Sequence, residues 1–408
     1  MDFKGLVRGA GKGGYLTVNK KTSTGNDLPN AELLKETVHK HLLSLGFSRN
    51  CKGYFVEGEL TKQKIRDLHS AQRIQVLEQN RLFIERYGLE LTSHFANGKD
   101  LNPSQIDPEL IEVKANSLES RLFRFASLLW SVPVSKGFGR RIRFLVRDRQ
   151  NGCLIGLFAL GDPVFNLSVR DNWIGWTHEE RSERLVHVMD AYVVGAVPPY
   201  SQLIGGKLVA SLLTSQEVRK VYERKYLGSK TVIRKRNNRA RLVLLTTTSA
   251  LGRSSLYNRL SIPGGAQFLN IGTTKGFGHF HLSGEVFELL RGYLSAIDHP
   301  YAKAHQFGLG PNWRIRVVRA ALEEIGIDGN SVLKHGIKRE VYGIPIASNW
   351  REILLGTQKN VRSSTLRASE IAQFCLNRWI LPRADRDHRY KELSRRDITE
   401  TLLVGGSE

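Results

Sequence analysis

The chain has 408 residues, 41% hydrophobic and 9% aromatic, so it can build a globular core but is too long for one ordinary domain. Its 61 Lys and Arg residues outnumber its 39 Asp and Glu residues, and the net charge of +22 favours a polyanionic partner such as nucleic acid. The sequence has no apolar run long enough to span a bilayer, no evident signal peptide, and three isolated cysteines that exclude a disulfide framework, so we expect a cytoplasmic protein without a membrane partner.

The N-terminal quarter is predicted to be a basic arm followed by helices. Residues 1–24 are rich in Gly, Lys and Thr, which is typical of a flexible terminal arm. In residues 25–105, apolar side chains recur every three or four positions, and Asn30 and Gly46 are the residue types that begin and end a first helix. Turn residues and prolines near the end of this range indicate a boundary.

Residues 106–298 are predicted to form the α/β core, with a mixed sheet. Strand-like segments flank the turn Gln150–Gly152, which indicates a β-hairpin. A strand that ends in Pro-Pro then precedes a Gly-Gly turn and an amphipathic helix. A further strand, a short helix and the aromatic strand-like segment "FLNIGTTKGFGHFHL" follow. Residues 299–408 are predicted to be a basic, mainly helical region.

The stretch "AVPPYSQLIGGKLVASLLTS" suggests a first functional site. Its order of strand, glycine turn and helix resembles the GNAT-like acetyltransferase fold, in which backbone N–H groups and a helix N-terminus bind the pyrophosphate of acyl-coenzyme A. The resemblance implies that the cofactor-binding positions are Gln202, Gly205, Gly206 and Lys207. Lys207 departs from the Gly or Ala that is usual there, so a side chain could either contact phosphate or block the cofactor.

The same resemblance suggests two catalytic residues. Tyr257 lies where such enzymes carry a general-acid tyrosine, and Asp190, before the Pro-Pro strand end, is a candidate general base. The alternative interpretation is structural: the two glycines only turn the chain, Asp190 caps a helix and Tyr257 packs in the core. The sequence leaves both interpretations open and does not determine a cofactor.

The triplet His279-Phe280-His281 suggests a second kind of site. HUH-type single-strand nucleases bind a divalent metal with a His-hydrophobic-His pattern, and residues i and i+2 of a strand project from the same face. Tyr301 and Tyr342 are candidates for the tyrosine that such an enzyme requires. No acidic third ligand is evident, so we assign no metal site. The alternative is a polar pair on an aromatic strand.

Three basic runs suggest nucleic-acid binding. Clustered Arg and Lys neutralise phosphates, and a neighbouring aromatic ring can stack on an exposed base. The residues in question are Arg140, Arg141, Arg143, Lys230, Arg234, Lys235, Arg236, Arg239, Arg241, Trp313, Arg314 and Arg316. No sequence-reading module such as a zinc finger is evident, so the sequence favours contact with DNA or RNA without naming its strand form.

Long strings between residues 110 and 325 resemble the DruA family of the Druantia anti-phage defence system. They include "GCLIGLFALGDPVFNLSVRDNWIGW", "RLVHVMDAYVVGAVPPYSQLIGGKLVA" and "HPYAKAHQFGLGPNWRIR". The resemblance implies a component of a multi-protein antiviral system with a very large helicase-like protein among its partners. It implies no reaction. We therefore expect a nucleic-acid-contacting defence subunit, with an acyl-coenzyme A-dependent N-acyltransferase and a metal-dependent HUH-like nuclease as alternatives.

Overall fold

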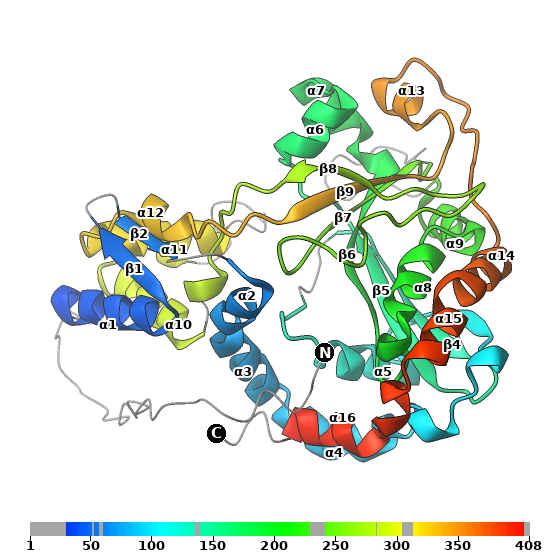
Figure 1. The fold of residues 1–408 in the computed structure, drawn as a ribbon. Helices are drawn as coiled ribbons and strands as arrows, with labels where there is room; N and C mark the ends of the chain where they lie inside the picture. The colour runs from blue at the N-terminus through cyan, green and yellow to red at the C-terminus, as the bar shows by residue number, and fades with distance from the viewer. Residues whose placement is uncertain are drawn as a thin grey trace.

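The computed structural model describes residues 30–50, 53–56, 60–134, 139–228, 241–282, 284–303 and 313–403. These residues form a larger body built on a sheet and a smaller, mainly helical body beside it (Figure 1). The helices α2 (Lys62–Leu68) and α3 (Ser70–Gln79) run between the two bodies. The predicted arm, residues 1–24, lies outside the described part of the chain.

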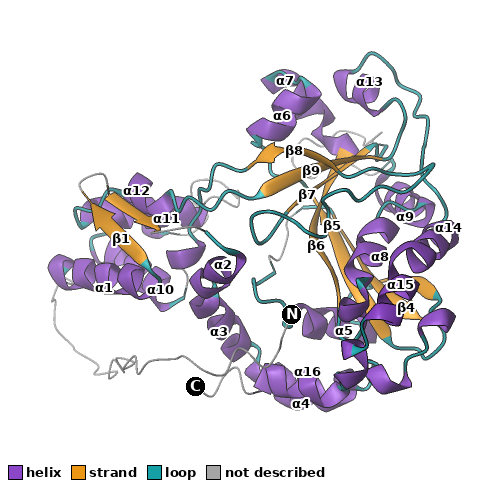
Figure 2. Ribbon diagram, viewed as in Figure 1, coloured by secondary structure: helices purple, strands orange, loops and turns teal. Residues whose placement is uncertain are grey.

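A mixed sheet of seven strands is the frame of the larger body (Figure 2). Its strands are β3 (Pro108–Glu112), β4 (Arg141–Asp148), β5 (Leu154–Gly161), β6 (Val188–Ala196), β7 (Leu244–Thr248), β8 (Leu269–Thr273) and β9 (Glu340–Pro345). They lie in the order β3-β4-β5-β6-β7-β9-β8, and β6 and β7 are the one parallel pair. The predicted α/β class is therefore confirmed, and so is the hairpin at Gln150–Gly152, which joins β4 to β5.

Helices cover both faces of the sheet. On one face, α8 (Gly205–Leu212) packs on β5 and β6, and α9 (Gln216–Tyr226) and α14 (Ala368–Cys375) extend the same core. On the other face lie α4 (Arg81–Thr92), α5 (Leu118–Ser127) and α16 (Arg395–Leu403). Side chains of β4 alternate between these cores, as a strand requires: Phe144 and Val146 face α8, and Leu145 faces α5.

A third group of helices, α6 (Ser168–Ile174), α7 (His178–Arg184) and α13 (Trp350–Leu355), lies at the β8–β9 end of the sheet (Figure 1). Trp173 of α6 stacks on Trp350 of α13, with ring centroids 4.5 Å apart. A Cβ at Gly343 of β9 would lie 2.6 Å from the Trp173 ring, so the glycine lets this tryptophan lie flat against the sheet.

The smaller body joins two distant parts of the sequence in one core. Its elements are α1 (Ala31–Ser44), β1 (Phe47–Asn50), β2 (Gly53–Val56), α10 (Glu285–Ala296), α11 (Trp313–Glu324) and α12 (Gly329–Leu333). The predicted N-cap is confirmed, because the Asn30 side chain accepts hydrogen bonds from the N–H groups of Glu32 and Leu33. The buried side chains of α1, Leu34, Val38 and Leu42, share this core, in which α1 packs against α10.

The helices α10–α12 are an insertion between two neighbouring strands. The chain leaves the sheet at the end of β8, builds these helices and returns as β9, which pairs with β8. The Thr274 N–H donates to the Arg339 carbonyl at 2.9 Å, so the two crossing segments lie side by side. Within the described residues, no helix has both the length and the apolar character that crossing a bilayer requires.

Candidate functional site

The two parallel strands β6 and β7 separate partway along the sheet. They pair only at Val188–Leu244, Met189–Leu245 and Asp190–Thr246. Beyond Asp190, β6 continues in pairing with β5 alone, and beyond Thr246, β7 pairs with β9 alone. The C-terminal ends of β6 and β7 are therefore not paired with each other, and we call this opening the split. At its start, the Thr247 hydroxyl donates a hydrogen bond to the Ala191 carbonyl at 2.8 Å.

Asp190 lies at the point where the split begins. The Thr246 hydroxyl donates a hydrogen bond to its Oδ1 at 2.6 Å. Burial raises the pKa of Asp190 to about 6, although the Thr246 hydrogen bond and the positive charge of Arg170 act in the opposite direction. A carboxyl with this pKa exchanges a proton near neutral pH, as a general base must.

Tyr257 lies in the loop that follows β7, close enough to Asp190 for the negative charge of Asp190 to act on it. Its ring packs against Phe268 and Tyr342, with centroids 5.7 Å and 5.4 Å away, and the residue is 7% exposed. Burial raises the pKa of Tyr257 to about 12, and a hydrogen bond with Thr247 opposes that shift. The phenol is therefore protonated at neutral pH and can donate.

The structure thus brings the predicted pair Asp190 and Tyr257 to one end of the split. The alternative that Asp190 caps a helix is wrong, because it lies within β6. The alternative that Tyr257 packs in the core agrees with its two aromatic neighbours. Thr246 and Arg170 were not predicted from the sequence. For Thr246 the available signal was the run Thr246–Thr248, a polar end to an otherwise apolar strand.

The predicted strand–turn–helix is present between β6 and α8. After the strand, a 3₁₀ turn at Tyr200–Leu203 and a left-handed Ile204 lead directly into α8 at Gly205. A Cβ at Gly205 would lie 2.6 Å from the Tyr200 carbonyl oxygen, so packing of the turn itself requires glycine there. A Cβ at Gly206 would meet only the Leu256 side chain, at 3.2 Å. Gly205 is thus explained by the fold without a cofactor.

The other two predicted cofactor positions contact the C-terminal segment. Lys207 Nζ lies 5.0 Å from the centroid of the Trp379 ring, and burial, followed by the charge of Arg378, lowers the pKa of Lys207. The Gln202 carbonyl accepts a hydrogen bond from Arg383 Nε at 3.3 Å. Helix α15 (Leu381–Arg386) and the π-turn before it therefore occupy the side of the glycine turn on which these groups lie.

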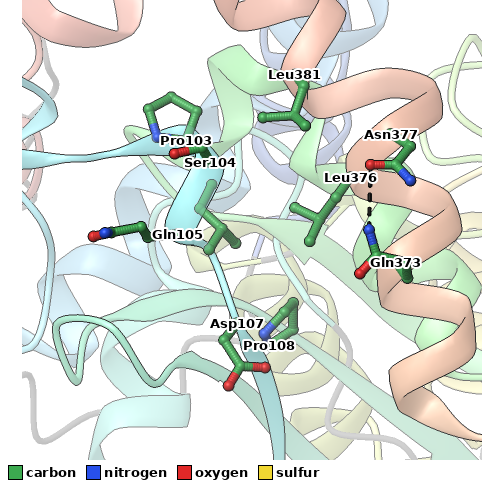
Figure 3. A pocket seen from close by; sticks show the side chains of 10 residues that line it. Pro103, Ser104, Gln105, Asp107, Pro108, Gln373, Leu376, Asn377 and Leu381 are labelled. Atoms are coloured by element: carbon green, nitrogen blue, oxygen red, sulfur yellow. Dashed lines mark hydrogen bonds between the residues drawn. The ribbon is translucent and has the colours of Figure 1, made fainter.

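A pocket of about 300 Å³ lies elsewhere along the same C-terminal segment (Figure 3). One wall comes from residues 103–108 and the other from Gln373, Leu376, Asn377 and Leu381. Gln373 Nε2 donates to Asn377 Oδ1 at 3.2 Å within it. None of the predicted site residues lines this pocket.

The expectation that His279 and His281 lie on a strand is wrong. Residues Phe280–Leu282 form a 3₁₀ turn, because β8 ends at Thr273 and the Gly278 N–H bonds to the Leu333 carbonyl instead of to a strand. The alternation that would place both rings on one face is therefore absent there.

The His281 ring is held in the smaller body's core, and His279 is half-buried near it. His281 Nε2 lies 3.0 Å from the Val332 carbonyl, and its ring stacks on Phe47. Burial lowers the pKa of His281 to about 3 and that of His279 to about 4. Among the described residues, no group of three or more His, Cys, Asp or Glu side chains could hold a metal ion.

Arg140 is tied into the larger body. Its Nε pairs with Asp162 Oδ1 at 2.6 Å, and its terminal nitrogens donate to the carbonyls of Val186 and Val188 and to the Tyr222 hydroxyl. Its side chain is 14% exposed. These contacts give Arg140 a structural role and leave it little surface with which to reach a phosphate.

Those of the remaining predicted basic residues that the structure describes do not gather on one surface. Arg141 is exposed and Arg143 half-buried on β4, whereas Trp313, Arg314 and Arg316 lie on α11 in the other body (Figure 1). Arg241 lies 3.6 Å from Glu223. Five members of the set lie outside the described residues: Lys230, Arg234, Lys235, Arg236 and Arg239.

Comparisons with known proteins give one consistent result. The model of a protein family described as "Druantia protein DruA" matches residues 59–356. A curated protein with the same description, from Escherichia coli (strain UMEA 4076-1), is 47% identical over 370 residues, which cover 90% of this chain and 91% of the relative. No solved structure matches the chain. The family match includes the split between β6 and β7, the glycine turn and the histidine pair, and ends before α14.

Proposed function

Because this chain belongs to the Druantia DruA family and is thus a component of an anti-phage defence system, we propose that its task in that system is to bind nucleic acid. The observation that carries this proposal is the charge balance. Even if every carboxylate of the chain neutralised one Lys or Arg, 22 positive charges would remain. Such an excess attracts phosphodiester backbones through release of their counterions.

The proposal is tested by fluorescence anisotropy with the full chain and labelled oligonucleotides, single-stranded and duplex. The expected result is binding at about 50 mM salt that weakens steeply toward about 200 mM, with a linear relation between log affinity and log salt. Absence of binding to both oligonucleotides at the lower salt would refute it.

Acyl transfer is a second candidate, favoured by the sheet. Its strand order, with one parallel pair that splits beside a strand–turn–helix, supports the predicted GNAT-like topology. Where β6 and β7 are not paired with each other, their backbone N–H and C=O groups can bond to an extended chain that contains amides. Coenzyme A carries such a chain. Asp190 and Tyr257 supply a base and a hydrogen-bond donor at the start of the split.

Calorimetric titration with acetyl-coenzyme A tests this second candidate. Binding at micromolar affinity would support it. No heat with the full chain would remove it, and the contacts of Gln202 and Lys207 with α15 and Trp379 would then be the physical reason.

From the family resemblance we also propose that the protein acts in the cytoplasm beside other Druantia proteins, including the large helicase-like one. Co-purification of the tagged full chain with its co-expressed neighbours tests this partnership. Recovery of the tagged chain alone would contradict it.

A further inference from the structure

The segments that enter and leave the inserted helices pair through their backbones. The Gly278 N–H donates to the Leu333 carbonyl at 2.9 Å, and the Gly336 N–H donates to the Gly276 carbonyl at 3.0 Å. Residues 274–278 and 333–339 therefore form one connected surface at the junction of the two bodies, and the side chains beside these bonds lie near one another.

A phenylalanine is exposed at the centre of this junction. Phe277 is 45% exposed, so a face of its ring is accessible to solvent. It lies between two glycines whose backbones are fixed: Gly276 has φ +68°, and a Cβ there would lie 2.8 Å from the Gly336 carbonyl carbon. The backbone thus presents the ring to solvent in a fixed position.

Positively charged side chains lie on the two segments and on the helix beside this ring. Lys275, Lys334 and Lys338 are exposed on the two paired segments. The Arg319 guanidinium of α11 lies 6.0 Å from the centroid of the Phe277 ring. Arg314, earlier on α11 and exposed, is near enough for its charge to lower the pKa of His279. Within the described part of the chain, none of these five cations forms an ion pair with a carboxylate.

We propose that this surface, formed by Lys275, Phe277, Arg314, Arg319, Lys334 and Lys338, binds single-stranded nucleic acid. An exposed aromatic ring within a group of uncompensated cations has the two parts that such binding uses: stacking on an unpaired base and neutralisation of the adjoining phosphates. A duplex offers the phosphates but keeps its bases stacked on each other, so the Phe277 ring specifically favours the single strand.

The inference rests on the proposed nucleic-acid binding and gives it a location. Of the residues that the sequence predicted, the proposed surface includes Arg314. Its aromatic residue is Phe277 and not the predicted Trp313. Trp313 is half-buried and its ring meets the buried Phe287 ring edge-on, so it offers less surface for stacking on a base than Phe277 does. Phe277 is an exposed ring beside α11.

The first test is the affinity of the full chain for a labelled thymidine strand of about 20 nucleotides, measured by fluorescence anisotropy. Phe277→Leu keeps an apolar side chain without a π face and is expected to weaken single-strand binding about fivefold or more, with little effect on duplex binding. Phe277→Tyr keeps the ring and is expected to bind as the wild type does. The circular dichroism melting curves of the wild type and of both variants are expected to coincide, because the Phe277 side chain is exposed.

The second test is the salt dependence. Replacing Lys275, Lys334 and Lys338 together by Gln is expected to reduce the slope of log affinity against log salt by about 2. The matched control replaces three exposed lysines of the larger body, Lys99, Lys220 and Lys359, and is expected to leave the slope unchanged.

The outcomes separate the two proposals. If the wild type binds and both the Phe277→Leu and the triple-lysine variants match the control, this surface is not the site, while the proposed function stands. Equal loss of single-strand and duplex binding in Phe277→Leu would overturn the stacking argument. If the wild type binds no oligonucleotide, the proposed function fails and this inference fails with it.

Discussion

Replacement of Asp190 by asparagine is the sharpest test of the candidate site at the split between β6 and β7. Burial raises the pKa of Asp190 to about 6, from an ordinary value of 3.8. Between these two values the unfolded chain has lost the proton that the folded chain still holds, so the folded state loses stability as the pH rises from about 4 to about 6. The asparagine side chain carries no charge at any pH in this range, and the stability of the variant lacks this contribution to the pH dependence.

The magnitude follows from the shift of about two pKa units, which corresponds to about 3 kcal/mol. The stability of Asp190→Asn relative to the wild type is therefore expected to be about 3 kcal/mol higher at pH 7.5 than at pH 4, because only the wild type loses this contribution. Since the chain has more than one core, we compare melting curves of the two proteins across pH, instead of extracting one unfolding free energy.

A companion variant isolates the cause. Thr246→Val removes the hydroxyl that donates to Asp190, and its destabilisation is expected to grow with pH as Asp190 ionises, to about 2 kcal/mol. In the double variant Asp190→Asn/Thr246→Val this growth is expected to vanish. Parallel wild-type and Asp190→Asn curves from about pH 4 to about pH 7.5 would refute a raised pKa and remove the support for Asp190 as a base.

Three further predictions concern residues whose contacts in the structure differ from the roles that the sequence suggested. Arg140→Ala is expected to destabilise the fold by about 3–5 kcal/mol in chemical denaturation, because Asp162 and two carbonyls lose their donor; unchanged stability would contradict this. Gly205→Ala is expected to lower the melting temperature and Gly206→Ala to have little effect; equal effects would contradict the packing argument. Burial lowers the pKa of His281 to about 3, so the wild type is expected to lose about 2 kcal/mol between pH 6.5 and pH 5 through this group, a loss that His281→Phe removes in acid-melting curves.

The sequence predicted local structure where one residue decides it. Asn30 is the N-cap of α1 because its side chain suits the free N–H groups of a helix start, and the turn Gln150–Gly152 joins β4 to β5. The ion pair of Arg140 could also have been predicted from the hairpin. The hairpin pairs Arg141 with Gly161, and this register brings Arg140 to Asp162.

Other features depend on contacts that periodicity does not show. The triplet at His279–His281 has a strand-like composition, but Gly278 bonds to the distant Leu333, and the backbone turns. The contact between Lys207 and Trp379 depends equally on a distant segment. Phe277 was overlooked because a single phenylalanine between glycines is indistinguishable, in sequence, from one that is buried.

The insertion of α10–α12 between neighbouring strands makes the smaller body removable. Since Thr273 and Glu340 are paired in the sheet, a short loop could replace everything between them and close β8 and β9 into an ordinary hairpin. The excision would strip α1 of its partners, so the segment before α3 has to go as well. A minimal chain trimmed at both places would keep the seven-stranded sheet and lack the Phe277 surface. Such a chain would allow the contributions of the two bodies to be measured separately.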